Sequence, residues 1–157
     1  MKKPSGIATK GGDRATLLCV SPIEEDRISL EHIFSRPGTN PSWSIRGAID
    51  LESALAVLRQ FEVSIVLTEC NLLHGSWKDV LEAIFTFRDP PLLIVTSRLA
   101  DERLWAEALN LGVFDVLPQP FNSEEVIRTF TLAWRHWQDR HGIHCQRTRQ
   151  RAAESAA

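Results

Sequence analysis

Short apolar runs alternate along the chain with longer stretches whose apolar residues recur at helical spacing. The clearest runs lie at 16–20 (TLLCV), 63–69 (VSIVLTE) and 92–96 (LLIVT), and each suits a strand covered on both faces. Weaker strands are predicted at 43–48 and 113–118. Helices are predicted within the stretches 21–34, 50–61, 76–87, 100–112 and 122–140. Five strands alternating with five helices indicate an α/β fold with a parallel sheet and helices on both faces.

An ionisable residue, Glu69, ends one of the clear strands. Burying a carboxylate alone is costly, so Glu69 either belongs to a site or is held by neighbouring groups. In an open parallel sheet, functional groups gather beyond the carboxyl ends of the strands. Ser21 and Thr96 stand at the ends of the first and fourth strands, and we expect them to lie beside Glu69.

Composition is that of a globular protein with one domain. The 157 residues are 43% hydrophobic and 24% charged, with a formal net charge of −2. No apolar run approaches the roughly 20 residues of a membrane span. Three cysteines without CxxC spacing fit reduced thiols. We predict a cytoplasmic protein with no membrane or nucleic-acid partner, comprising a flexible leader (1–13), one domain (14–140) and a flexible tail (141–157).

Four segments resemble the receiver domain of bacterial two-component response regulators. IVLTECNLLHGSW resembles the third strand and loop of that family, with Glu69 where the family has its phosphorylated Asp. LLIVTSR resembles the fourth strand, with Thr96 as switch threonine, and LGVFDVLPQPF resembles the fifth strand and its Lys-Pro segment, with Gln119 replacing the Lys. GAIDLESAL resembles the lead into the second helix. The match runs from about Thr16 to Trp137 and implies a CheY-like, flavodoxin-like (βα)5 three-layer sandwich with strand order 2-1-3-4-5.

The resemblance implies a site that has lost most of its chemistry. Receivers bind Mg²⁺ through an acidic pair after the first strand, and Ser21 and Pro22 replace that pair here. Neither can supply the carboxylate oxygens that Mg²⁺ favours. The sequence instead predicts a capping box, with Ser21 as N-cap and Glu24 at N3, which places Glu25 and Asp26 in the first helical turns. We expect no bound Mg²⁺ and no other cofactor.

These replacements predict a stand-alone, degenerate pseudo-receiver that is not an enzyme. It would act in two-component (phosphorelay) signalling through protein–protein interaction, without Asp phosphorylation. Two interpretations of Glu69 stay open: it occupies the space of an aspartyl phosphate and holds Thr96 in the switched state, or it simply bonds backbone amides or faces solvent. The alternatives are a phosphorylatable regulator with an atypical site and a flavodoxin-like cofactor-binding protein. The second is disfavoured because no glycine-rich loop follows the first strand.

The C-terminal third of the chain predicts a partner-binding surface. In receivers the fourth helix, fifth strand and fifth helix form that surface, and here the corresponding residues are Trp105, Leu109, Val116 and Trp134. Exposed tryptophans favour interfaces, although packing of Trp105 against the last helix is an equal alternative. The implied partners are a signalling protein (a histidine kinase, another regulator or an output protein) and a second copy in a homodimer.

Two further signals near the C-terminus are weak. The spacing of its histidines and Cys145 does not suit a tetrahedral metal site, so no metal is predicted. The arginines of CQRTRQR would attract an acidic surface only weakly, and a flexible end is the preferred interpretation.

Overall fold

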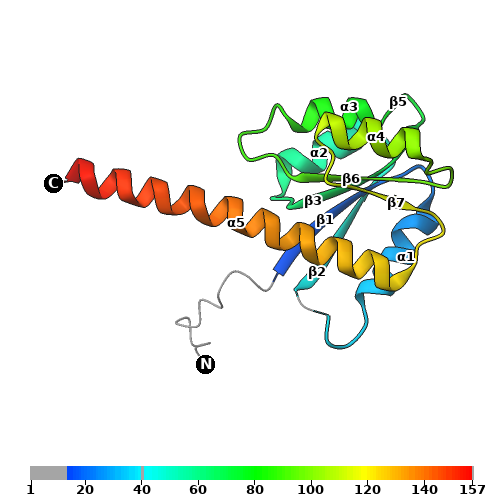
Figure 1. Ribbon diagram of the computed structural model, residues 1–157, viewed down its shortest axis with the longest axis horizontal. Helices are drawn as coiled ribbons and strands as arrows, with labels where there is room; N and C mark the ends of the chain where they lie inside the picture. The colour runs from blue at the N-terminus through cyan, green and yellow to red at the C-terminus, as the bar shows by residue number, and fades with distance from the viewer. Residues whose placement is uncertain (1–13, 40, 157) are drawn as a thin grey trace.

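A parallel five-stranded sheet forms the centre of the protein, for which the computed structural model describes residues 14–39 and 41–156 (Figure 1). The predicted leader at 1–13 lies outside the described residues. The sheet order is β2-β1-β3-β6-β7, and every neighbouring pair is parallel. The strands are β1 (Arg14–Val20), β2 (Ser42–Ala48), β3 (Ile65–Glu69), β6 (Leu92–Ser97) and β7 (Asp115–Pro118). The predicted fold class and strand order are confirmed.

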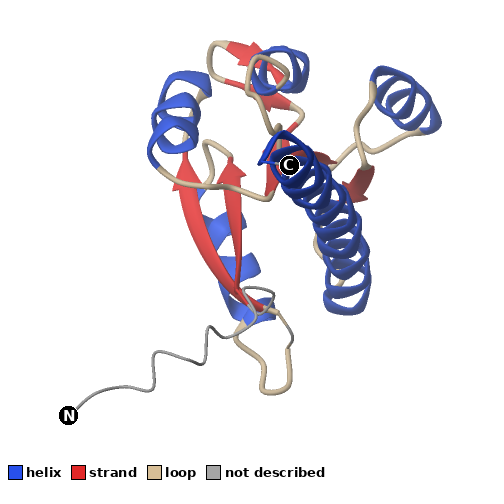
Figure 2. Cartoon of the chain, turned by 90° about the vertical axis from the view of Figure 1, so that its left-hand side faces the viewer, coloured by secondary structure: helices blue, strands red, loops and turns tan. Residues whose placement is uncertain are grey.

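In the part of the chain that the structure describes, five helices cover the sheet, and they lie on both of its faces (Figures 1 and 2). Their bounds are α1 (Glu24–Phe34), α2 (Leu51–Gln60), α3 (Trp77–Ile84), α4 (Glu102–Leu111) and α5 (Ser123–Ala156). Buried side chains of α2, α3 and α4 share one hydrophobic cluster with the sheet, and those of α1 and α5 share the other. The chain therefore folds as three layers, as the alternating pattern predicts.

The central strands are apolar on both sides because both of their faces are covered. In β3, Ile65 and Leu67 pack toward α1 and α5, whereas Val66 packs toward the opposite helices. All three side chains are at most 1% exposed. Each such side chain stabilises the fold by about 1.5–3 kcal/mol relative to exposure. Because both faces of the central strands are covered by helices, the polar side chains of these strands lie at or next to the strand ends.

A small hairpin connects β3 to α3, where the sequence predicts a loop. It pairs β4 (Asn71–Leu72) with β5 (Gly75–Ser76) in antiparallel fashion. Gly75 has φ 140°, and a Cβ there would lie 2.7 Å from Oδ2 of Asp79. That carboxylate accepts the backbone N–H of Ser76 at 2.8 Å, within a capping box that starts α3. Glycine is needed here for both its backbone angle and its lack of a side chain.

Two residues predicted for the interaction surface are part of the core. Val116 is 0% exposed and Trp134 is 6% exposed, so their assignment to a surface was wrong. Val116 lies in β7 and points toward the cluster beneath α4. Trp134 falls on the inward stripe of α5 with Val126 and Phe130, and its ring centroid lies 6.3 Å from that of Trp43. The spacing of four and eight residues from Val126 already indicated this buried face.

The last helix is longer than the sequence pattern predicts. α5 runs from Ser123 to Ala156, through the residues expected to form a flexible tail, and its C-terminal part extends away from the sheet (Figure 1).

Across residues 14–39 and 41–156, no helix combines the length and the apolar character needed to cross a membrane.

The burial of Trp134 gives a test of this core. Trp134→Ala should lower the free energy of unfolding by about 3–5 kcal/mol, because it removes a large buried ring and leaves a cavity. The matched control is Leu132→Ala, on the same helix but 50% exposed, which should cost less than about 1 kcal/mol. Urea denaturation followed by circular dichroism measures both. Similar losses in the two variants would contradict the packing described for α5.

Candidate functional site

The carboxyl ends of neighbouring strands bring the predicted site residues to one edge of the sheet. β1 pairs with β3 so that Val20 lies opposite Thr68, and β3 pairs with β6 so that Glu69 lies opposite Thr96. Ser21 directly follows β1 and therefore reaches the same edge. Gln119 directly follows β7, the last strand on this side. We refer below to Ser21, Asp26, Glu69, Thr96 and Gln119 as the carboxyl-edge site.

Asp26 enters this site from α1, whereas the sequence pattern predicts only a place in the first turns of that helix. Its carboxylate is buried, with the residue 6% exposed, and the Ser21 hydroxyl donates to its Oδ2 at 2.6 Å. The backbone N–H of Ile23 donates to Oγ of Ser21 at 3.1 Å, which closes a serine turn between β1 and α1. Ser21 thus holds a carboxylate in the site.

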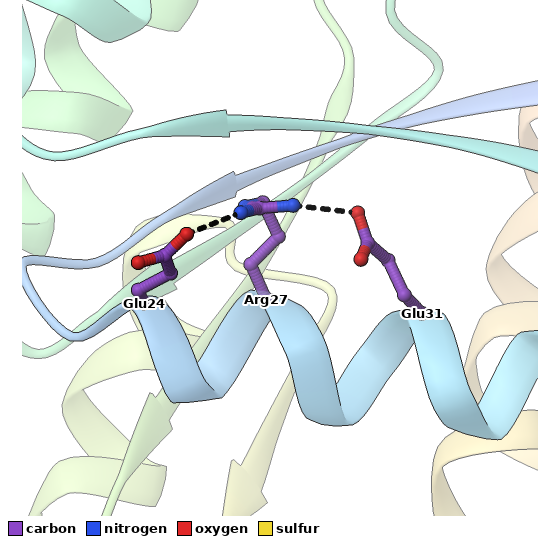
Figure 3. Close-up of polar contacts among 3 residues, drawn as sticks. All are labelled: Glu24, Arg27 and Glu31. Carbon is purple, nitrogen blue, oxygen red and sulfur yellow. Dashed lines mark hydrogen bonds and ion pairs between the residues drawn. The ribbon is translucent and has the colours of Figure 1, made fainter.

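The capping box predicted for α1 is wrong. The helix begins at Glu24, and its N-cap residue is Ile23, which makes no side-chain capping bond. The Ser21 oxygen lies too early in the chain to meet the first free N–H groups of the helix. Glu24, the expected partner in the box, instead pairs with Arg27 at 2.8 Å, and Arg27 also pairs with Glu31 at 2.7 Å (Figure 3).

A signal for Asp26 was present in the sequence. Asp26, Leu30 and Ile33 are spaced by four and three residues, and all three lie on the buried stripe of α1. An acidic residue in the first turn is also favoured by the helix dipole, and that explanation accounted for Asp26 without placing it inside. The apolar periodicity was the more informative of the two signals.

Glu69 has an electrostatic environment that disfavours its charged form. Burial, and secondarily the charge of Asp26, raise the pKa of the Glu69 carboxyl. The backbone N–H of Cys70 and the guanidinium of Arg98 act in the opposite direction on this pKa. Oε2 of Glu69 is buried and accepts no hydrogen bond from any described residue. The charge of Asp26 therefore adds to burial in disfavouring the ionised form of Glu69.

Thr96 and Gln119 do not form hydrogen bonds to Glu69. The Thr96 hydroxyl donates to the backbone carbonyl of Leu117 at 2.8 Å, within the sheet. Both side-chain polar atoms of Gln119 are buried and lack a hydrogen-bond partner among the described residues. A buried amide without partners is costly, so Gln119 is the group in the site whose interactions are least satisfied.

The carboxyl-edge site contains two carboxylates, Asp26 and Glu69, that could contribute to a cation site. Within the described residues, no group of three or more His, Cys, Asp or Glu side chains could hold a metal. Asp26 already accepts from Ser21, and the neighbouring Pro22 is exposed and offers no side-chain oxygen. A cavity of about 440 Å³ opens beside the site and is lined in part by Asp26, Arg98 and Gln119. Arg98 is the cation whose charge acts on the site, from the rim of that cavity.

The environment of Glu69 predicts how stability depends on pH. The folded-state pKa of Glu69 is raised, so the folded state binds more protons than the unfolded chain between the two pKa values. Stability contributed by the neutral carboxyl is complete below the unfolded pKa and is lost as pH rises through the folded pKa. Glu69→Gln removes the cost of the charged carboxylate, so it should raise the free energy of unfolding at about pH 7. This gain should vanish at about pH 4, where the wild-type carboxyl is also neutral.

Denaturation curves over this pH range measure the effect. The control is Glu52→Gln, whose side chain is exposed on α2. It should change stability little at either pH. A loss of stability in Glu69→Gln at neutral pH would mean that the charged carboxylate is held by favourable contacts and would contradict this description.

Comparison with known proteins places this architecture among signal receiver domains. None of the protein-family models matches the chain. Over 113 residues it is 22% identical to the regulatory protein VirG of Agrobacterium fabrum (strain C58) and 22% identical to VirG of Rhizobium rhizogenes. Each match covers 72% of this chain but 45% and 47% of those proteins, so the chain spans about half the length of the curated relatives it matches.

The solved structures agree with one another in fold. The signal receiver domain of a putative LuxO repressor protein from Vibrio parahaemolyticus superposes with a TM-score of 0.74 at 16% identity, covering 83% of this chain and 97% of that one. The receiver domain of an HD domain-containing protein from Pseudomonas fluorescens Pf-5 superposes with a TM-score of 0.72 at 22% identity. This match covers 83% of this chain and 93% of that one. A CheY-like receiver domain protein from Methanospirillum hungatei JF-1 superposes with a TM-score of 0.69 at 16% identity. This match covers 80% of this chain and 98% of that one. The chain therefore has the fold of CheY-like signal receiver domains.

Proposed function

We propose that this chain is a degenerate receiver domain that acts in two-component signalling by protein–protein interaction, without phosphorylation of its own site. The observation that supports the proposal is that a buried carboxylate, Asp26, acts electrostatically on the half-buried Glu69, which stands where the resemblance places the phosphorylated Asp. A phosphoryl group brings further negative charge. The charge of Asp26 already disfavours the ionised form of Glu69, and a site with two carboxyl groups opposes the arrival of that charge.

The cationic groups that assist phosphoryl transfer are also replaced. Catalysis of this reaction consists mostly of positioning and of stabilising charge with metal ions, Lys or Arg. Gln119 stands where the resemblance places the lysine, and an uncharged amide cannot neutralise a phosphate. Arg98 lies at the rim of the neighbouring cavity and is the cation that could partly substitute.

A second candidate is a regulator that is phosphorylated at an atypical site. Asp26 favours it, because this carboxylate supplies an acidic group near the position of the missing acidic pair. The hydrogen bond from Ser21 and the lack of a lysine weigh against it. The position of the Thr96 hydroxyl, directed to Leu117, likewise gives no support to Glu69 as a mimic of the phosphorylated state.

The partner-binding surface is proposed on α4. Trp105 is partly buried against the core and Leu109 is 48% exposed, so both can contribute to a contact from this helix. Val116 and Trp134 lie in the core, so Trp105 and Leu109 are the two predicted anchors that remain accessible to a partner. The proposed partner is a histidine kinase, another regulator or an output protein.

Incubation with acetyl phosphate and Mg²⁺ tests the absence of phosphorylation. Intact-mass measurement should show no phosphoryl adduct on the wild-type chain. The site lacks the family's charge-neutralising lysine and acidic pair, and position 69 is a glutamate and not an aspartate. Glu69→Asp alone should also remain unmodified. The combination Ser21→Asp, Pro22→Asp, Glu69→Asp and Gln119→Lys is the positive control, since it supplies the family's acidic and basic groups together.

A stable adduct on the wild-type chain would overturn the proposal and favour the second candidate. Asp26→Asn then decides between the two carboxylates: loss of the adduct would assign a role in the reaction to Asp26. An adduct on Glu69→Asp would show that the lysine and the acidic pair are dispensable.

Substitution on α4 tests the proposed surface. Trp105→Ala should reduce partner capture from the native host roughly tenfold, because aromatic anchors carry a large share of binding energy. The control is Leu99→Ala, which removes an apolar side chain that is 85% exposed in the loop before α4. Quantitative mass spectrometry of proteins retained by each variant measures the effect. Equal retention by wild type and Trp105→Ala, with circular dichroism unchanged, would remove α4 from the interface.

A further inference from the structure

Charge is distributed very unevenly along this chain. Residues 14–134 contain ten Lys and Arg against 17 Asp and Glu, a difference of −7. Residues 135–151 contain five Arg against one Asp, a difference of +4. The formal net charge of −2 therefore conceals an acidic body and a basic C-terminal segment. Both arginines of this segment whose side chains are described, Arg135 and Arg140, are exposed.

The basic segment is part of α5 and leaves the body with it. Figure 1 shows one continuous helix that extends past the sheet, with its C-terminal end far from the other helices. As long as α5 remains a single helix, its basic half cannot fold back onto the acidic body of the same molecule. Opposite charges within one chain are thus held apart and are free to meet between two chains.

The acidic charge of the body is concentrated on the layer opposite α5. Residues 50–112, which include α2, α3 and α4 together with the strands and loops between them, contain five Lys and Arg against ten Asp and Glu. Neither α3 nor α4 has a basic residue in its last turn, so the partial negative charge of both helix C-termini is uncompensated within the helix. This layer is therefore the strongest candidate to receive a basic segment.

The C-terminal ends of α3 and α4 also present an apolar surface. Phe85 is 57% exposed and Leu111 is 47% exposed. The two ends meet, because a Cβ on Gly112 would lie 3.5 Å from Cζ of Phe85. Glu82, one turn before Phe85, is exposed on α3. We name Glu82, Phe85 and Leu111 the helix-end patch. It combines exposed apolar area with acidic charge, the features that a basic helix can use.

We propose that the basic half of α5, residues 135–151, docks in trans onto the helix-end patch of a second copy of this chain. Two such contacts, related by a two-fold axis, would close a dimer. A second copy is the favoured occupant because the acidic body carried on the same chain repels a polyanion such as nucleic acid. The apolar residues of the patch likewise have no counterpart in a phosphate backbone. The proposal is separate from the α4 surface and does not depend on it.

Sedimentation equilibrium of the whole 157-residue chain tests the proposal. A dimer should form at about 50 mM NaCl, and its dissociation constant should rise roughly tenfold at about 500 mM, because the contact is largely electrostatic. Arg147→Gln with Arg151→Gln should weaken the dimer at low salt by roughly tenfold. Arg14→Gln with Arg128→Gln is the matched control: it removes the same two charges from the body and should leave association unchanged.

Substitutions in the helix-end patch test the receiving surface. Glu82→Gln and Phe85→Ala should each weaken the dimer severalfold, whereas Glu25→Gln and Leu99→Ala, matched exposed changes elsewhere, should not. Trp105→Ala should leave the dimer intact, which separates this contact from the partner surface on α4. A monomer at all salt concentrations, a dimer insensitive to salt, or equal weakening by the matched controls would overturn the proposal. Dissociation by Trp105→Ala, with the patch variants unaffected, would also overturn it, as would a monomer that binds duplex DNA through Arg147 and Arg151.

Discussion

Coverage of the parallel sheet on both faces is the constraint on which the rest of this protein depends. Once helices cover both sides of β3, its side chains must be apolar along nearly the whole strand, and Ile65, Val66 and Leu67 are. The first position at which a polar group can escape this layer is the carboxyl end. Glu69, Ser21 and Thr96 therefore meet at one edge for a reason of topology that holds whatever chemistry they perform. This is also why the fold survives when the site residues differ from those of the proteins it resembles.

The same constraint explains which parts of the structure were predictable. Short apolar runs separated by helical periodicity indicate a parallel sheet with helices on both faces, and that prediction is confirmed. The strand order, also confirmed, came from the resemblance to receiver domains and not from the periodicity. The carboxyl-edge positions followed from topology. The inward orientation of Asp26 did not, because a first-turn acid already has a local explanation in the helix dipole. Val116 and Trp134 were misplaced because their surface role came from resemblance, while their burial was visible in the alternation of β7 and the stripe of α5. The continuation of α5 depends on Gln, Arg and Ala, which favour helix without an apolar pattern to mark it.

The hydrogen bond between Ser21 and Asp26 changes what the site can do. A hydroxyl has one proton, and donating it to Asp26 stabilises a carboxylate inside the protein while adding no positive charge. The site then contains two acidic groups, Asp26 and Glu69, and an amide, Gln119, with no hydrogen-bond partner among the described residues. Burial and the charge of Asp26 raise the pKa of Glu69. Under the proposed function, the replacement of the acidic pair by Ser21 and Pro22 and the burial of Asp26 would both oppose the arrival of a phosphoryl group.

A column of aromatic rings determines how the basic half of α5 leaves the body. Trp43 of β2 lies 6.3 Å from Trp134, Trp134 stacks on Trp137 at 5.5 Å, and Trp137 stacks on His141 at 4.5 Å. Stacked rings of this kind add stabilisation beyond the area they bury. Nε2 of His141 also lies 4.0 Å from Oε1 of Glu62, just before β3. Because these contacts continue three turns beyond Phe130, the direction of the helix is fixed by the sheet itself. A segment that is rigidly directed loses less conformational entropy on docking than a flexible tail of the same charge, so the aromatic column makes the basic helix a better ligand for a second molecule.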